Sequence, residues 1–178
     1  MHSLSGTHNT SGSHPGTEVF LAIGSNKGDR ETLIRGALEG LRSGGFEVKE
    51  LSPLYETSPV DCEEGTPSFL NGVIRGFWRE TPESLLNLCQ GLERRAGRPE
   101  KHSSRQSREL DLDIIIFGQK IIRTERLTIP HPRAAKRSFV LVPLHDLSPE
   151  AIFPDCGKTV AELLKNLPGS TGIEPYQH

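Results

Sequence analysis

The chain has 178 residues, of which 34% are hydrophobic, and its formal net charge is −2. A chain of this length supports one well-buried core rather than two, and the near-neutral charge gives no global attraction to nucleic acid or to an anionic membrane. We therefore expect a single domain over residues 17–178, without nucleic-acid or membrane partners. The oligomeric state is not readable from the sequence, and we expect a monomer.

The N-terminus and the cysteines bear on location. The first 16 residues are rich in Ser, Gly, Thr and His, which indicates a flexible extension outside the fold. No stretch approaches the roughly 20 apolar residues that cross a bilayer, and the N-terminus lacks the apolar core of a secretory signal. The cysteines, Cys62, Cys89 and Cys156, form an odd set without paired spacing. This pattern argues against disulfides and favours the cytoplasm.

The first half of the chain predicts strands and one helix. Residues 18–23 form a buried strand, and Asp29 caps a helix that ends at Gly44-Gly45. A second strand covers residues 46–55, with a phase break near Lys49 that indicates a bulge. A long polar loop then runs over residues 56–68, and the third strand covers residues 69–78.

The second half completes a recognisable order. Thr81-Pro82 opens a second helix with an apolar stripe, and residues 110–117 form a fourth strand. Near the end, a capping box over residues 159–162 opens a short helix through about Leu167. The order strand, helix, strand, strand, helix, strand predicts an α+β fold with a ferredoxin-like βαββαβ core, an antiparallel sheet and a C-terminal extension. This fold hosts many functions and does not select one.

Asp111 and Asp113 interrupt the otherwise apolar fourth strand. Because side chains alternate along a strand, both carboxylates project to one face, roughly 6.6 Å apart at about 3.3 Å per residue. Carboxylates this close repel each other unless a cation neutralises them. The spacing alone leaves a magnesium site and a solvated strand edge equally open. A basic segment over residues 94–108 precedes the strand, and together with the acids it favours a polyphosphate site.

Five motifs occur in the order and spacing of one enzyme family. They are Ala22-Ile23-Gly24-Ser25-Asn26, Tyr55-Glu56-Thr57-Ser58-Pro59, Phe69-Leu70-Asn71, Leu110-Asp111-Leu112-Asp113-Ile114 and Leu127-Thr128-Ile129-Pro130-His131-Pro132-Arg133. The chain therefore resembles 6-hydroxymethyl-7,8-dihydropterin pyrophosphokinase, a folate-pathway enzyme that transfers pyrophosphate from ATP to a pterin alcohol. The resemblance runs from about residue 19 to residue 164.

The resemblance also implies roles for individual residues. Asp111 and Asp113 would hold two Mg²⁺ ions against the phosphates of ATP, and Arg98 and Arg108 would join them in catalysis. ATP contacts would come from Gln90, Glu93, Arg98, Lys101, Arg108, Ile114, Arg126, Thr128, His131 and Arg137. Pterin contacts would come from Thr57, Ser58, Val60, Phe69, Asn71 and Phe139, with the two phenylalanines as the walls of a stacking slot. A solvated helix face stays open for Gln90 and Glu93, and ordinary core for the phenylalanines.

Two other functions stay open. A ferredoxin-like binding module could meet phosphates through its basic segment, although acids on the fourth strand would repel a nucleic-acid backbone. A transferase with the same metal chemistry could act on a different alcohol. The chain also departs from the family over residues 104–107, where Ser104-Arg105-Gln106-Ser107 replaces a segment that contains tryptophan in many members.

Overall fold

The structure, a computed structural model, describes residues 15–58, 65, 67–97, 109–169 and 172–177. The predicted N-terminal extension lies outside the described residues apart from its last two positions. In chain order the elements are β1 (Thr17–Ser25), α1 (Arg30–Ser43), β2 (Glu47–Leu51), β3 (Tyr55–Thr57), β4 (Phe69–Trp78), α2 (Pro82–Arg95), β5 (Asp111–Phe117), β6 (Ile122–Arg123), β7 (Thr128–Ile129), the 3₁₀ helix η1 (Ala134–Lys136), α3 (Ser138–Leu147), β8 (Ile152–Phe153), β9 (Lys158–Thr159), α4 (Val160–Lys165) and β10 (Ile173–Pro175).

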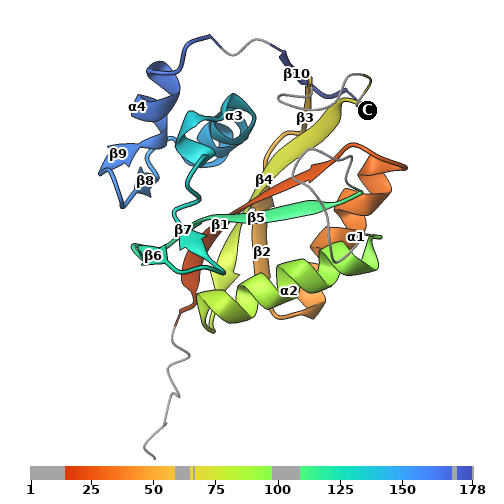
Figure 1. The fold of residues 1–178 in the computed structure, drawn as a ribbon, viewed down its shortest axis with the longest axis horizontal. Coiled ribbons are helices and arrows are strands. Elements are labelled where there is room, and N and C mark those ends of the chain that lie inside the picture. The colour runs from red at the N-terminus through yellow and green to blue at the C-terminus, as the bar shows by residue number, and fades with distance from the viewer. Residues whose placement is uncertain (1–14, 59–64, 66, 98–108, 170–171, 178) are drawn as a thin grey trace, which may run out of the picture.

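The main sheet is antiparallel and has the order β10-β3-β4-β1-β5 (Figure 1). The strands β2 and β3 both pair with β4, β3 at residues 69–71 and β2 at residues 74–77. Two small hairpins, β6-β7 and β8-β9, lie outside this sheet. The predicted ferredoxin-like βαββαβ order is therefore confirmed. In this order β4 is the strand that follows the long loop, and β5 is the strand that follows the second helix.

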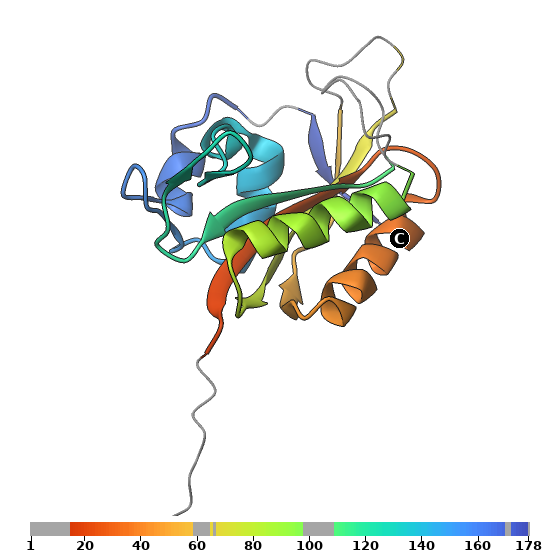
Figure 2. The same ribbon diagram turned by 60° about the horizontal axis from the view of Figure 1, so that its bottom comes forward.

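The helices α1 and α2 lie side by side on one face of the sheet (Figure 2). Each begins where its capping residue predicts: the Asp29 carboxylate accepts a hydrogen bond from the Thr32 N–H at 3.1 Å, and the Thr81 hydroxyl accepts one from the Ser84 N–H at 3.2 Å. Their apolar stripes pack on the strand residues that face them, including the fully buried Leu21. This layer forms the larger of the two core clusters.

The helix α3 covers the opposite face and was not predicted. Its residues Val140 and Leu144 join Phe20, Val73 and Ile115 of the sheet in a second buried cluster. The helix carries Pro143 in its interior and is apolar on most sides. Its sequence therefore lacks both the polar face and the proline-free helical stretch that indicate a surface helix. A buried helix of this kind resembles a strand in sequence.

The prediction of one strand over residues 46–55 is wrong. The strand is interrupted at Ser52. The Ser52 backbone N–H donates to the Val73 carbonyl at 2.9 Å, and the Ser52 hydroxyl accepts a hydrogen bond from the Val73 N–H at 2.9 Å. Pro53 follows and has no N–H for the ladder. The predicted bulge is confirmed, because the β2-β4 register shifts between Val48 and Glu50. The predicted loop starts later than expected, since residues 56 and 57 belong to β3.

The C-terminal part ends on the sheet. The predicted capping box is present at the start of α4, which ends at Lys165, two residues before the expected end. After α4 the chain returns to the far edge of the sheet, where β10 pairs with β3 (Figure 1). A three-residue strand containing Pro175 gives no periodic signal, so this pairing was not predicted. None of the helices in the described ranges is long and apolar enough to span a membrane.

Candidate functional site

A row of residues crosses four strands on the face that α3 partly covers. Tyr55 of β3 pairs with Asn71 of β4, Asn71 with Gly24 of β1, and Gly24 with Asp111 of β5. Paired residues in an antiparallel sheet point their side chains to the same face. The next row along the sheet contains Asp113. The register therefore places predicted pterin residues and predicted metal residues on one surface.

The pterin end of this surface is built on β3 and β4. The Asn71 amide donates a hydrogen bond to the Thr57 hydroxyl at 2.6 Å. Thr57 also pairs with Phe69, whose ring is half-buried, and Ser58 is exposed at the end of β3. A Cβ atom on Gly24 would lie 2.5 Å from the Asn71 Oδ1 atom, so glycine is needed for this amide to lie over β1. The structure brings these predicted residues together.

The predicted metal residues of this surface lie on β5. Asp111 and Asp113 are half-buried and alternate with Leu112 and Ile114, which are buried on the opposite face against α2. The two carboxylates therefore share one face, as predicted. Among the described residues no group of three or more His, Cys, Asp or Glu side chains gathers around a metal-sized space. Carboxylate oxygens nevertheless match the hard-ligand preference of Mg²⁺, which is commonly held by one or two carboxylates together with substrate phosphates.

Glu93 of α2 lies beneath β5. Its side chain is only 4% exposed, and its carboxylate accepts a hydrogen bond from the Leu112 N–H at 2.9 Å. The solvated-face alternative is therefore wrong for Glu93, and Gln90 of the same helix is half-buried. The signal was present in the sequence, because Glu93 lies four residues after Cys89, within the apolar stripe. Direct contact of either residue with ATP stays a prediction.

His131 lies beside β5, where its backbone N–H donates to the Ile115 carbonyl at 3.0 Å. Burial, with the charges of Arg137 and Arg133, lowers the pKa of His131 to about 4. The imidazole is therefore neutral at physiological pH. Its Nδ1 atom accepts from the Arg133 N–H at 3.2 Å, which leaves the proton on Nε2 as a donor. Sequence reasoning missed the role of Arg133 in setting this tautomer.

Phe139 is the second residue of α3, and its ring lies near Arg137. The Arg137 guanidinium carbon lies 5.3 Å from the centroid of the Phe139 ring, a cation–π distance. The ring is half-buried against the second core cluster. This position does not distinguish a pterin-stacking ring from an ordinary core residue, because a ring at the edge of the core fits both roles.

The other predicted site residues lie on several different elements or outside the described residues. Arg126 is exposed and donates to the Asn87 Oδ1 atom of α2 at 2.9 Å, and Thr128 is half-buried in β7. Ile114 is buried within β5. Four predicted residues, Val60, Arg98, Lys101 and Arg108, lie outside the described residues, and so does the divergent segment 104–107.

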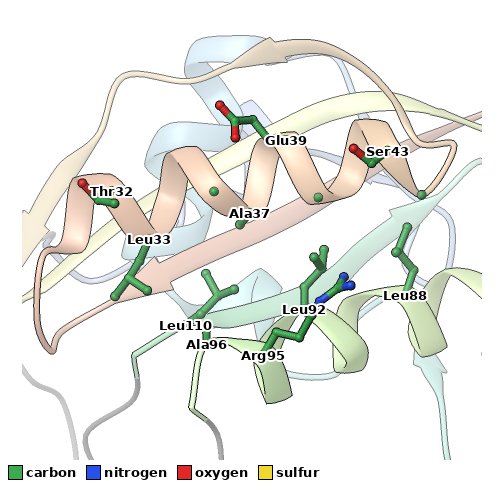
Figure 3. A pocket seen from close by; sticks show the side chains of 13 residues that line it. Thr32, Leu33, Ala37, Glu39, Ser43, Leu88, Leu92, Arg95, Ala96 and Leu110 are labelled. Carbon is green, nitrogen blue, oxygen red and sulfur yellow. The ribbon is translucent and has the colours of Figure 1, made fainter.

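Neither of two clefts formed by described residues is lined by the aspartates. The larger, of about 610 Å³, lies between α1 and α2, on the face of the sheet that Asp111 and Asp113 do not share. Figure 3 shows Leu33, Leu88 and Leu92 pointing into it. The smaller, of about 420 Å³, lies near the pterin end and is lined by Asn26, Lys27, Gly28, Arg30, Glu56, Pro67 and Ser68.

Comparison with known proteins gives one consistent family. The model of 7,8-dihydro-6-hydroxymethylpterin-pyrophosphokinase (HPPK) matches residues 20–149. The 2-amino-4-hydroxy-6-hydroxymethyldihydropteridine pyrophosphokinase of Aquifex aeolicus (strain VF5) is 35% identical over 144 residues, covering 81% of this chain and 88% of that protein. The folic acid synthesis protein fol1 of Schizosaccharomyces pombe is 41% identical over 159 residues, or 89% of this chain.

Several similar proteins are much longer than this chain, which spans 21% of fol1. Two plant relatives, from Arabidopsis thaliana and Pisum sativum, are folate synthesis bifunctional proteins named as mitochondrial. Among solved structures, wild-type Plasmodium falciparum HPPK-DHPS with pteroate matches with a TM-score of 0.64 and 16% identity, covering 86% of this chain and 45% of that one. This last likeness bears on the fold alone.

Proposed function

Because the chain belongs to the 7,8-dihydro-6-hydroxymethylpterin-pyrophosphokinase family, we propose that it transfers pyrophosphate from ATP to 6-hydroxymethyl-7,8-dihydropterin in folate synthesis. The observation that carries the proposal is the row from Asn71 to Asp111. Two strand spacings separate these residues, roughly 10 Å, so a carboxamide and a carboxylate face one surface across the width of a small substrate.

The pterin half of the reaction uses hydrogen bonds and stacking. A carboxamide presents both a donor and an acceptor to the edge of a flat heteroaromatic ring. The Asn71 amide is held by Thr57 at 2.6 Å, which fixes its orientation before the pterin arrives. Phe69 and Phe139 supply half-buried aromatic faces from β4 and α3, which would gain dispersion energy from the ring.

The phosphate half uses the charges around β5. Asp111 and Asp113 would hold Mg²⁺, which when bound neutralises phosphate charge and orients the transferred group. The Nε2–H of neutral His131 would donate to a phosphate oxygen, and Arg137 would add positive charge beside it. Arg98, Lys101 and Arg108 are proposed as further phosphate contacts on the strength of the family motif. Charge stabilisation and orientation would supply most of the rate enhancement.

The proposed chemistry is a single in-line displacement. The hydroxymethyl oxygen of the pterin forms a bond to the β-phosphorus, and the bond from that phosphorus to the bridging α-phosphate oxygen breaks. AMP leaves with that oxygen, and the hydroxyl proton passes to solvent. We also propose that residues 17–178 act as one monomeric domain in the cytoplasm. The single domain is supported by the main sheet, whose two faces both carry a buried core cluster.

The test is AMP release from ATP by the purified chain, with and without 6-hydroxymethyl-7,8-dihydropterin, in Mg²⁺ and in excess chelator. The proposal expects AMP only when the pterin and Mg²⁺ are both present. Asp113→Ala should lower the rate at least 100-fold while thermal unfolding shows an intact fold. Equal AMP release without the pterin would refute the substrate, and near-normal turnover by Asp113→Ala would refute the metal site.

A second candidate, transfer to a different alcohol, is separated by the aromatic wall. Phe139→Ala should weaken binding of the dihydropterin about tenfold and ATP binding much less, because the ring would stack on the pterin and reaches the ATP side only through its cation–π contact with Arg137. Equal weakening for both ligands would identify Phe139 as core only and would favour the second candidate.

A further inference from the structure

The C-terminal strand β10 pairs with β3, so that β3, which carries Thr57, is an interior strand of the sheet rather than an edge strand. Ile173 pairs with Thr57 and Pro175 with Tyr55, so the three residues of β10 match the three residues of β3. Backbone hydrogen bonds continue the pairing at both ends, from the Ser58 N–H to the Gly172 carbonyl at 2.9 Å and from the Tyr176 N–H to the Leu54 carbonyl at 2.8 Å. The chain end therefore spans the whole length of β3.

The side chain of Tyr176 extends this attachment to α1. Its hydroxyl donates to the Glu31 Oε1 atom at 2.6 Å, and the Arg30 guanidinium carbon lies 5.8 Å from the centroid of its ring. The ring also packs against the main core cluster. Tyr176 thus holds the first turn of α1 by a hydrogen bond and by a cation–π contact at the same time.

Arg30 in turn joins the strands on either side of the pterin end. Its Nη1 atom donates to the Glu56 Oε1 atom of β3 at 2.8 Å and to the Ser68 carbonyl, just before β4, at 3.0 Å. Glu56 and Ser68 flank Thr57 and Phe69, the two predicted pterin residues that pair with each other. A single guanidinium therefore bridges β3 and the start of β4 where the pterin would bind, in addition to the backbone pairing of the two strands.

The geometry points to Tyr176 and Arg30 as positioning residues for the pterin, an inference that rests on the proposed function. Neither side chain is expected to touch the substrate. Tyr176 holds the Arg30 guanidinium, and Arg30 holds β3 at the register in which the Thr57 hydroxyl accepts from the Asn71 amide at 2.6 Å. The ATP half lies on β5, at the other edge of the sheet, so loss of this contact chain should affect the two substrates unequally.

The test compares KM values for the dihydropterin and for ATP in Tyr176→Leu and Tyr176→Phe. Leucine keeps apolar bulk against the core but removes the ring and the hydroxyl, and we expect the pterin KM to rise about fivefold to tenfold, with the ATP KM within twofold of wild type. Phenylalanine restores the ring over Arg30 and should return the pterin KM to within about threefold of wild type.

Arg30→Gln reaches the same contact chain from the other side and gives a second route if leucine at position 176 lowers the yield of folded protein. The double variant should raise the pterin KM no more than the stronger single variant, since both changes break one chain of contacts. Phe77→Ala is the matched control, because the Lys49 Nζ atom lies 5.9 Å from that ring at the opposite end of β4. It should leave both KM values unchanged.

The outcomes separate this inference from the proposed function. A wild-type chain that releases no AMP refutes the proposed function itself. An active wild type whose Tyr176→Leu and Arg30→Gln variants keep a pterin KM within twofold refutes the positioning role alone. Parallel increases in both KM values, or additive effects in the double variant, identify the two residues as general structural supports and also overturn the inference.

Discussion

The buried carboxylate of Glu93 offers the sharpest test of how β5, the strand of the proposed metal ligands, is held. It accepts the Leu112 N–H at 2.9 Å, and Leu112 is the residue between Asp111 and Asp113. Glu93→Ala would leave that buried N–H without this acceptor, which costs about 1–3 kcal/mol, and would add a small cavity. We expect the free energy of unfolding to fall by about 2–3 kcal/mol, or the melting temperature by roughly 4–12 °C for a chain of this size.

Glu93→Gln separates the hydrogen bond from the charge. Its side-chain carbonyl can still accept the Leu112 N–H, so the loss should stay below about 1 kcal/mol. The Mg²⁺ concentration for half-maximal AMP release should rise with alanine and much less with glutamine, because only alanine frees the backbone between the two aspartates. Glu39→Ala, an exposed change on α1, is the stability control. If alanine and glutamine at position 93 were equally harmful, or alanine harmless, the reasoning would be refuted.

Two further predictions concern Gly24 and the cysteines. Gly24→Ala should displace the flexible Asn71 amide, whose Oδ1 atom would lie 2.5 Å from the new Cβ. Titration should then show weaker dihydropterin binding with little change in ATP binding. An unchanged pterin affinity would contradict the placement of this amide. Burial, followed by nearby acidic charge, raises the pKa of the Cys89 thiol, while Cys156 is exposed. Alkylation followed by peptide mapping should modify Cys156 in the folded protein and Cys89 only after unfolding, and equal rates for the two would contradict the burial.

Local signals in the sequence predicted the elements that depend on neighbouring residues. The strand over residues 69–78 has the bounds that its apolar run predicts, and the caps at Asp29 and Thr81 form the expected hydrogen bonds. The failures fall where distant contacts decide. Ser52 leaves the β-ladder because its hydroxyl takes the Val73 N–H, and β10 exists only because β3 offers it an edge. Neither partner is visible from the local pattern.

The candidate site was predictable as a set of residues but not as a surface. The motifs supply Asn71 and Asp111, yet their alignment through Gly24 depends on the register of three strands far apart in the chain. A slip of one residue would turn either side chain to the opposite face. The β1-β5 register also shifts between Phe20 and Leu21, and no residue near that point predicts the irregularity.

The alternation along β1 distinguishes the two faces of the sheet once the register is known. Leu21 and Ile23 point to the main core and are almost fully buried, while Ala22 and Gly24 point to the face of the aspartates. On the main-core face β1 therefore presents large side chains to α1 and α2, and at positions 22 and 24 it presents only small ones to the opposite face. The Asn71 amide lies over Gly24 and so reaches toward β5, which brings the proposed pterin contact nearer to the strand of the proposed metal ligands than the strand spacing alone would. A Cβ atom at Gly24 would lie 2.5 Å from the Asn71 Oδ1 atom, so a bulkier residue there would disturb the proposed pterin contact.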